Sequence, residues 1–244
     1  MSFGYQNVTL SDLQYSWPIL LGGFVLAYLI GSIPFAYIIV RRVTGEDITA
    51  HGTGNVGAMN VRRSTGSWTW FAVAMLADAL KGLLPVLFVM TKAWNQSGWW
   101  TISLSPYEGI SVPARAVLAP LVVAGCVLGH NYSLWMALIS KRFVRTGKGL
   151  ATGAGALLAY DWRYFVTVLT VGLLVIAVTR YMMAGQVAAT ITLPVAALLL
   201  GSPDWPFALL MGLLVYSAHH RRFVGLLRGQ EPRLYINDRM GPKG

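Results

Sequence analysis

The chain has 244 residues, of which 55% are hydrophobic and 11% are charged, and its mean hydropathy is +0.57. Soluble domains carry about 25% charged residues, so this composition excludes an ordinary water-soluble protein and predicts a membrane protein with a single domain over residues 1–244. The net charge of +10 does not argue for nucleic-acid binding, because basic residues that orient a membrane protein account for it.

Seven apolar runs follow one another along the chain, at about 17–40, 67–91, 114–138, 149–160, 162–179, 182–202 and 205–218. A helix needs roughly 20 apolar residues to cross the hydrocarbon layer, so the fourth and seventh runs are short. Only Asp161 and Arg163 mark the boundary between the fourth and fifth runs. We therefore expect an all-α, polytopic membrane bundle of about seven transmembrane helices, with five or six spans as open alternatives.

The positions of lysine and arginine support an odd number of spans. With seven spans, only Lys92, Arg115 and Arg163 fall on one side, Lys81 lies within a span, and the other basic residues fall on the opposite side. Basic residues concentrate in cytoplasmic loops. The asymmetry predicts an N-terminus outside and a C-terminus inside.

The first run ends in a stretch that combines a helix break with a polar loop. Gly31, Ser32 and Pro34 predict a bend, since proline lacks a backbone donor; a simple kink is the alternative. Residues 52–66 then hold several glycines together with Asn55, Asn60, Arg62 and Arg63. Arginine can grip a phosphate with two hydrogen bonds, and asparagine offers directional donors. We expect a binding loop here rather than a solvated connector.

Asp78 and Lys81 lie three residues apart within the second run. At that spacing the two side chains share a helix face and can neutralise each other. Ionisable residues inside a membrane indicate a functional site, although a structural pair buried in the bundle is a close alternative. We interpret this pair as supporting a site rather than as catalytic.

Residues 129–155 form the stretch most typical of phosphate binding. It contains His130 and then Thr146, Gly147, Lys148 and Gly149 at the start of an apolar run. A glycine-rich turn that opens a helix presents backbone N–H groups and a positive dipole end. The glycines at 149 and 153 also fit close packing of membrane helices, which is the structural alternative.

The last polar stretch, residues 219–231, begins with His219 and His220 and continues through Arg228 to Glu231. Histidine titrates near neutrality and can act as an acid, a base or a phosphate contact. A histidine at a helix end beside arginines can equally be a capping or interfacial residue.

Taken together, these motifs resemble those of the bacterial acyl-phosphate:glycerol-3-phosphate acyltransferases, which are seven-helix enzymes of the inner membrane. The resemblance covers most of the chain in the same order. It is carried by Gly31-Ser32-Ile33-Pro34-Phe35, Gly52 to Val61 with Arg63, Asp78 with Lys81-Gly82, Gly129-His130, Gly147 to Thr152, and His219 with Gly229 and Glu231.

The resemblance implies transfer of a fatty acyl group from acyl phosphate to the 1-hydroxyl of glycerol 3-phosphate, with no cofactor and no metal, at the cytoplasmic side of the bacterial inner membrane. The implied partners are therefore these two substrates and membrane lipid. The resemblance places Ser32 and His219 at the reaction centre. Substrate-binding roles fall to Asn55, Asn60, Arg63, Gly147, Lys148, Gly149, Thr152 and Glu231, and supporting roles to Asp78, Lys81 and His130. An acyl-enzyme on Ser32 is less favoured, since no histidine–carboxylate pair is evident beside it.

Several positions depart from the family pattern. The family usually has serine at Thr53, threonine at Met59, glycine at Thr146 and arginine at Thr49. It also usually has asparagine at Arg222 and arginine at Gly225. We expect the chemistry to be retained despite these changes.

Two other functional classes can be compared with this one. The His-x-x-x-x-Asp signature of acyl-CoA-dependent glycerol-phosphate acyltransferases is absent from the sequence. A transporter or channel for an anionic metabolite is the alternative function, because basic inner loops and an intramembrane Asp78–Lys81 pair would also suit it. The inverted repeats common in transporters are not evident.

Overall fold

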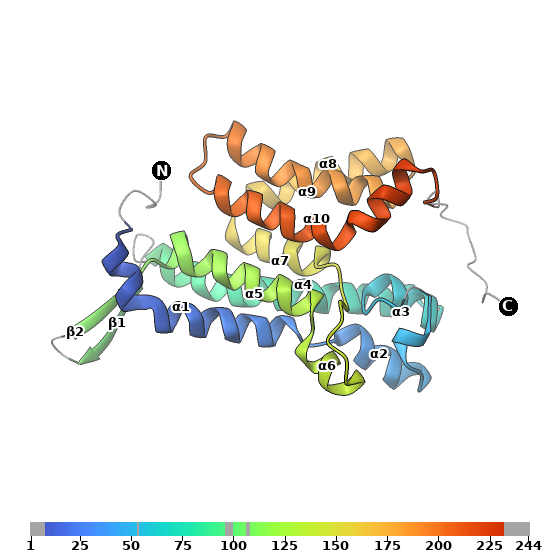
Figure 1. Ribbon diagram of the computed structural model, residues 1–244, viewed down its shortest axis with the longest axis horizontal. Coiled ribbons are helices and arrows are strands. Elements are labelled where there is room, and N and C mark those ends of the chain that lie inside the picture. Colours follow the sequence, from blue (N-terminus) through green and yellow to red (C-terminus); the bar gives the residue numbers. More distant parts are fainter. Residues whose placement is uncertain (1–7, 53, 96–99, 106–107, 232–244) are drawn as a thin grey trace.

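The computed structural model describes residues 8–52, 54–95, 100–105 and 108–231. Figure 1 shows a helical bundle in which α1, α4 and α5 form one group, α8, α9 and α10 form a second group, and α7 lies between them. The elements are α1 Leu10–Gly31, α2 Phe35–Thr44, η2 Ile48–Ala50, α3 Ala58–Thr65, α4 Trp68–Asn95, β1 Trp100–Ser105, β2 Glu108–Val112, η3 Ala114–Leu118, α5 Ala119–Asn131, α6 Leu134–Ser140, α7 Leu150–Tyr160, α8 Trp162–Thr179, α9 Met182–Leu199 and α10 Trp205–Leu227.

The two ends of the bundle differ. We call the end that carries α2, α3, α6 and the start of α7 the loop end (Figure 1). The opposite end, called the hairpin end, carries β1, β2, η3 and residues 200–204. The strands β1 and β2 form an antiparallel hairpin in which Trp100 lies opposite Val112, and this pair of strands was not predicted from the sequence.

The predicted helical membrane bundle is confirmed. Within the described part of the chain, five helical stretches are long and apolar enough to cross a membrane: Leu10–Thr44, Trp68–Thr91, Ala114–Ser140, Trp162–Thr179 and Met182–Leu199. The helix α7 is apolar but has only 11 residues, which corresponds to about 16 Å. Large apolar side chains point outward on several helices; Leu26, Leu76, Leu173 and Val178 are each at least 56% exposed, as expected of surfaces that face lipid.

Two predicted runs are interrupted. The run at 17–40 is divided into α1 and α2 at residues 32–34, and the run at 114–138 is divided into η3, α5 and α6. The break between α5 and α6 has a local cause, since the hydroxyl group of Ser133 accepts a hydrogen bond from the N–H of Met136 at 3.1 Å and so begins a new helix. Both breaks between α-helices lie at the loop end, where they place polar backbone groups.

A small core holds the loop end together. Val40 of α2, Ile48 of η2, Val56, Val61 of α3 and Met136 of α6 are all buried in one cluster. Burial of apolar area is the main stabilising contribution for such a cluster. The polar loop between α2 and α3 is therefore anchored by apolar residues, which fixes its position beside α6.

Close contacts at glycines bring α4 and α7 together. A Cβ atom added at Gly82 would lie 2.0 Å from the carbonyl oxygen of Thr152, and one added at Gly155 would lie 2.0 Å from that of Ala79. No side chain can be accommodated at such distances without moving the backbone. Small residues allow this close approach between membrane helices.

We expect Gly82→Ala to destabilise the protein, because the new methyl group must push α7 away from α4. Overpacking of this kind costs about 1–3 kcal/mol or more. Gly22→Ala is the matched control, since no neighbouring atom lies within 4 Å of a Cβ added there. Thermal unfolding in detergent should show a clear loss for Gly82→Ala and little change for Gly22→Ala; equal midpoints would contradict the packing described for α4 and α7.

Candidate functional site

The break between α1 and α2 is stabilised by Ser32. Its N–H and its hydroxyl group both donate to the carbonyl oxygen of Tyr28, at 2.9 and 2.7 Å. The hydroxyl group of Ser133 donates to the carbonyl oxygen of Ser32, which ties the break to the start of α6. Ser32 is buried. Its hydroxyl group thus has a defined structural role at the helix end.

Three buried ionisable side chains meet next to this break. Lys81 Nζ lies 2.8 Å from Asp78 Oδ1 and donates to the carbonyl oxygen of Ile33 at 3.0 Å. His130 Nδ1 lies 3.6 Å from the same oxygen of Asp78. The pairing expected from the spacing of Asp78 and Lys81 is therefore present, and it connects α4 to the break and to α5. Removal of one partner from such a buried pair is strongly destabilising.

The segment before α7 is held against the end of α5. The hydroxyl group of Thr146 donates to the carbonyl oxygen of His130 at 3.1 Å, and the N–H of Thr146 donates to that of Asn131 at 2.8 Å. The N–H of Val56 donates to the carbonyl oxygen of Thr146 at 2.7 Å. Thr146 therefore makes a side-chain contact that glycine could not make, and its backbone brings the loop before α3 beside the segment that leads into α7.

The predicted glycine-rich turn opens a helix, as expected. Gly149 has φ +75° and is the N-cap of α7, with no hydrogen bond from a capping side chain. A Cβ atom at Gly147 would lie 2.3 Å from Nε2 of His130, so the backbone there runs directly against the imidazole. Lys148, between the two glycines, is half-buried. The arrangement places a lysine beside the positive end of α7.

Two buried polar atoms lie close to this turn. Thr152 Oγ1 and Asn131 Oδ1 are among the buried side-chain atoms that have no hydrogen-bond partner in the described part of the chain. Thr152 is on the first turn of α7, and Asn131 Oδ1 lies 3.0 Å from the position that a Cβ at Gly149 would occupy. Because buried polar atoms are normally satisfied, these two atoms make the start of α7 a candidate site for a polar ligand group.

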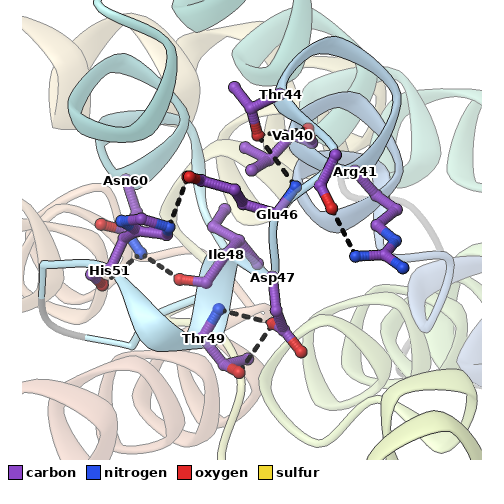
Figure 2. Close-up of polar contacts among 10 residues, drawn as sticks. Val40, Arg41, Thr44, Glu46, Asp47, Ile48, Thr49, His51 and Asn60 are labelled. Atoms are coloured by element: carbon purple, nitrogen blue, oxygen red, sulfur yellow. Dashed lines mark hydrogen bonds and ion pairs between the residues drawn. The ribbon is translucent and has the colours of Figure 1, made fainter.

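Figure 2 shows the loop that precedes α3. The side-chain N–H₂ group of Asn60 donates to the carbonyl oxygens of Ile48 and His51, both at 3.0 Å, and His51 Nε2 lies 2.7 Å from a carboxylate oxygen of Glu46. The amide nitrogen of Asn60 is therefore engaged with the loop backbone. The oxygen that remains is an acceptor, which does not bind a phosphate oxygen. This geometry suits Asn60 to holding the loop in shape rather than to contacting phosphate.

The neighbouring position Thr49 also has a local role. Its N–H and its hydroxyl group donate to Asp47 Oδ1 at 2.8 and 2.7 Å (Figure 2). These bonds cap η2. Where the family usually has arginine, this chain thus has a threonine that orders the loop.

Arg63 and Asn55 belong to the same region. Arg63 is exposed, and its Cδ lies 3.1 Å from the position of a Cβ added at Gly52. The aliphatic part of the arginine side chain therefore packs against Gly52. Asn55 is half-buried, and its Nδ2 lies 2.8 Å from the corresponding position at Gly57. Both side chains therefore lie close to the backbone of the loop.

His219 and Glu231 come from the end of α10 and the residues that follow it. His219 is buried, and its Nδ1 is 2.8 Å from the carbonyl oxygen of Val215. Glu231 is half-buried, and its Oε1 lies 3.5 Å from the position of a Cβ added at Gly225. Glu231 therefore lies beside Gly225, where the family usually has arginine.

An apolar cavity of about 230 Å³ is lined by residues of α5, α7, α8, α9 and α10. At the loop end its lining includes Gly149 and Val215, and at the hairpin end it includes Leu157 and Phe165. Lys148 precedes Gly149 in the chain, and His219 is one helical turn beyond Val215. The cavity thus begins next to residues that were assigned from the sequence to phosphate binding and to the reaction centre.

The structure brings some of the predicted residues into one connected set. Ser32, Lys81, Asp78, His130 and Gly147 are joined through hydrogen bonds, ion pairs and close contacts around the helix break. His219 belongs to α10, which lies across the cavity from α5, and Glu231 follows α10 in the chain.

Asn131 and Ser133 were missed from the sequence. Both closely follow His130 in the chain. The Gly129-His130 motif was therefore the sequence feature that could have pointed to these two polar residues. Two of the departures from the family pattern, Thr53 and the side chain of Arg222, lie outside the described residues.

Comparison with known proteins points to one family. Residues 21–229 match the family model described as glycerol-3-phosphate acyltransferase. The chain is similar to the glycerol-3-phosphate acyltransferase of Thermus thermophilus, with 38% identity over 212 residues, which cover 86% of this chain and 92% of the relative. It is also similar to that of Gluconobacter oxydans, with 35% identity over 218 residues, which cover 87% and 92% of the two chains.

Two crystal structures of the integral membrane glycerol 3-phosphate acyltransferase PlsY share this fold. The glycerol 3-phosphate form has a TM-score of 0.70 and 27% sequence identity, and the match covers 89% of this chain and 96% of that one. The lysophosphatidic acid form has a TM-score of 0.69 over the same shares of the two chains.

Proposed function

The chain belongs to the glycerol-3-phosphate acyltransferase family, and from this premise we propose the full reaction that it catalyses. A fatty acyl group moves from acyl phosphate to the 1-hydroxyl of glycerol 3-phosphate, which gives 1-acylglycerol 3-phosphate (lysophosphatidic acid) and phosphate. This is the first step of phospholipid synthesis. Family membership favours this enzyme over an anion transporter.

The observation that carries the proposal is the position of the apolar cavity. Its lining at the loop end includes Gly149, directly after Lys148, and the first turn of α7 holds the unpartnered Thr152 Oγ1. A donor with a fatty chain and a phosphate group needs an apolar channel that ends at cationic and N–H donors. The chain would lie in the cavity, and the phosphate would lie at residues 147–149.

Glycerol 3-phosphate would bind on the other side of the same turn. The hydrogen bond between Val56 and Thr146 places the loop that precedes α3, with Asn55, beside the segment leading into α7. Arg63 would bind the phosphate of the acceptor, Asn55 would help to orient it, and Glu231 would accept a hydrogen bond from a hydroxyl group. The amide of Asn60, by holding the loop, would act indirectly.

The chemistry follows from this placement. The 1-hydroxyl oxygen attacks the acyl carbon, the bond from that carbon to the phosphate oxygen breaks, and the leaving phosphate takes up the hydroxyl proton. Lys148 and the N-terminus of α7 would stabilise the charge that develops on the phosphate and on the carbonyl oxygen. His219, one turn beyond the cavity lining, would orient the reacting groups.

Ser32 would support the site rather than form an acyl-enzyme. Its hydroxyl group donates to the carbonyl oxygen of Tyr28. A histidine–carboxylate pair does lie near the break, His130 with Asp78 at 3.6 Å, but within the described part of the chain this pair makes no hydrogen bond to Ser32. A serine nucleophile needs a base that removes its proton. Ser32 would hold the helix break, while Asp78, Lys81 and His130 would fix α1, α4 and α5 around it.

The proposed topology is a single integral membrane domain of the bacterial cytoplasmic membrane, with seven crossings, its N-terminus outside and its loop end in the cytoplasm. Exposed Lys141, Arg142 and Arg145 lie at the loop end, in agreement with the preference for basic residues inside.

Cysteine labelling in intact cells tests this orientation, because the natural Cys126 is buried. Arg145→Cys should react only with reagents that cross the membrane, since Arg145 lies at the loop end. Arg163→Cys, at the hairpin end, should also react with impermeant reagents. The reverse pattern would contradict the topology.

The donor can be identified directly. We expect the purified protein in lipid to convert labelled glycerol 3-phosphate to lysophosphatidic acid with hexadecanoyl phosphate, and to form no product with the matching acyl-CoA. In the proposed placement, residues 147–149 would hold the one phosphate group of the donor and the cavity would hold its acyl chain. Product from acyl-CoA alone would overturn the assignment of the donor and leave the acyltransferase activity intact.

A further inference from the structure

The apolar cavity has a length that can be related to an acyl chain. Along α8 its lining extends from Phe165 at the hairpin end to Ile176 at the loop end. This part of α8 corresponds to about 16 Å of helix. The hydrocarbon core of a bilayer is about 30 Å thick, so the cavity is about as long as one leaflet is deep. One extended acyl chain would therefore occupy it from end to end.

Two aromatic rings lie beyond the residues that line the hairpin end of the cavity. Leu157 of α7 lines the cavity, and about one turn further along α7 the ring of Tyr160 packs against Phe207, with ring centroids 5.2 Å apart. The hydroxyl group of Tyr160 donates to Asp204 Oδ1 at 2.8 Å, and the guanidinium of Arg115 lies over the Tyr160 ring. These contacts fix the rings in place.

Charged groups lie behind the rings. Arg115 Nη2 lies 3.8 Å from Asp161 and 3.9 Å from Asp204. Burial acts to raise the pKa of Asp161, but hydrogen bonds from Arg163 and the charges of Arg163 and Arg115 outweigh burial and hold the pKa below its usual value. The carboxylate is therefore charged at neutral pH. A methyl end that moved beyond the rings would have to displace water from ionised groups, which is costly.

We propose that the hairpin end of the cavity limits the length of the donor, with Leu157 and Phe165 as the residues that set the longest acyl chain accepted. The inference rests on the proposed function, because it requires the acyl chain to lie in the cavity. A chain that fits ends at these two side chains. A longer chain extends toward Tyr160 and Phe207, which lie about one turn beyond Leu157 on α7 and Met211 on α10, and the packing of these two rings opposes it. Its reacting carbonyl carbon is then displaced from the start of α7.

The test is a profile of kcat/KM against donor length, with saturated acyl phosphates of increasing chain length. Phe165→Ala should shift the profile toward longer donors, because it removes the ring that stops the chain. The ratio of kcat/KM for donors just above and just below the natural limit should rise about tenfold, which is the low end of what one methylene group contributes in an apolar pocket. The KM for glycerol 3-phosphate should stay the same.

A second variant should give the opposite result, and it still tests the proposal if the first variant folds poorly. Leu157→Phe adds volume at the same end and should shift the profile toward shorter donors. Val166→Ala is the matched control, since Val166 follows Phe165 in α8 but is 45% exposed. Its profile should match that of the unsubstituted protein.

The outcomes separate the inference from the function on which it rests. Opposite shifts in the two variants would establish the length limit. Unchanged profiles in active Phe165→Ala and Leu157→Phe proteins would overturn it and leave the acyltransferase function intact. Absence of product from the unsubstituted protein with every acyl phosphate would instead contradict the proposed donor, and the length limit with it.

Discussion

Replacing Lys148 with alanine is expected to lower kcat/KM with acyl phosphate by about 10²–10³, the usual loss when one donor to a developing negative charge is removed. Lys148 lies between two glycines at the start of α7, next to the loop end of the apolar cavity. Initial rates of lysophosphatidic acid formation at several donor concentrations give the value. Lys148→Arg should retain part of the activity because it keeps the charge.

Arg142→Ala is the matched control for this substitution. Arg142 is a basic residue of the same segment, but it is exposed and lies just after the end of α6, away in sequence from the turn that opens α7. Its activity should be close to that of the unsubstituted protein. Equal losses of kcat/KM in Arg142→Ala and Lys148→Ala would show that activity depends on the total positive charge of the segment. Lys148 would then have no specific role at the donor phosphate.

The second large effect concerns the buried pair at α4. Lys81→Met should destabilise the protein by about 3–5 kcal/mol, because it leaves the carboxylate of Asp78 buried without its ammonium partner. It also removes the hydrogen bond to Ile33 that connects α4 to the break after α1. Thermal unfolding in detergent measures the loss.

A double variant separates the pair from the individual residues. Lys81→Met combined with Asp78→Leu removes both charges, and replacement of a buried ion pair by apolar residues of similar volume is often neutral or stabilising. The double variant should therefore recover most of the stability lost by Lys81→Met alone. If the double variant were as unstable as the single one, the unpaired carboxylate would not be the cause of the loss.

Much of the helical architecture could be predicted because polar residues or glycines interrupt the apolar runs. The run expected at 162–179 is α8, Trp162–Thr179, and the run at 149–160 is α7, Leu150–Tyr160. Asp161 is the N-cap of α8, which explains why such a short interruption separates two helices. The seventh run was placed at 205–218, but α10 continues to Leu227, since a helix end carrying charged residues has no apolar signal.

Other features had no sequence signal of that kind. The break after Asn131 occurs within an apolar run whose one proline, Pro120, lies at the start of α5 and not at the break, and it depends on the cap provided by Ser133. The hairpin of β1 and β2 likewise depends on pairing between strands, which a single segment does not reveal.

The candidate site was partly predictable, because its residues belong to motifs that can be identified in the sequence. The ordered motifs identified Ser32, Lys81, His130 and Gly147, and the close approach of the helices brings these residues together. The direction of a side chain could not be read from the sequence. Asn60 is the clearest case, because only the structure shows that its amide nitrogen is engaged with the loop backbone.

The most direct test of the central claim is to measure phosphate release and lysophosphatidic acid formation in the same reaction, with purified protein in lipid, hexadecanoyl phosphate and glycerol 3-phosphate. Direct transfer at the start of α7 predicts one phosphate for each lysophosphatidic acid, and neither product when glycerol 3-phosphate is left out. Release of phosphate without glycerol 3-phosphate would contradict direct transfer, and no lysophosphatidic acid from a folded protein would contradict the reaction itself.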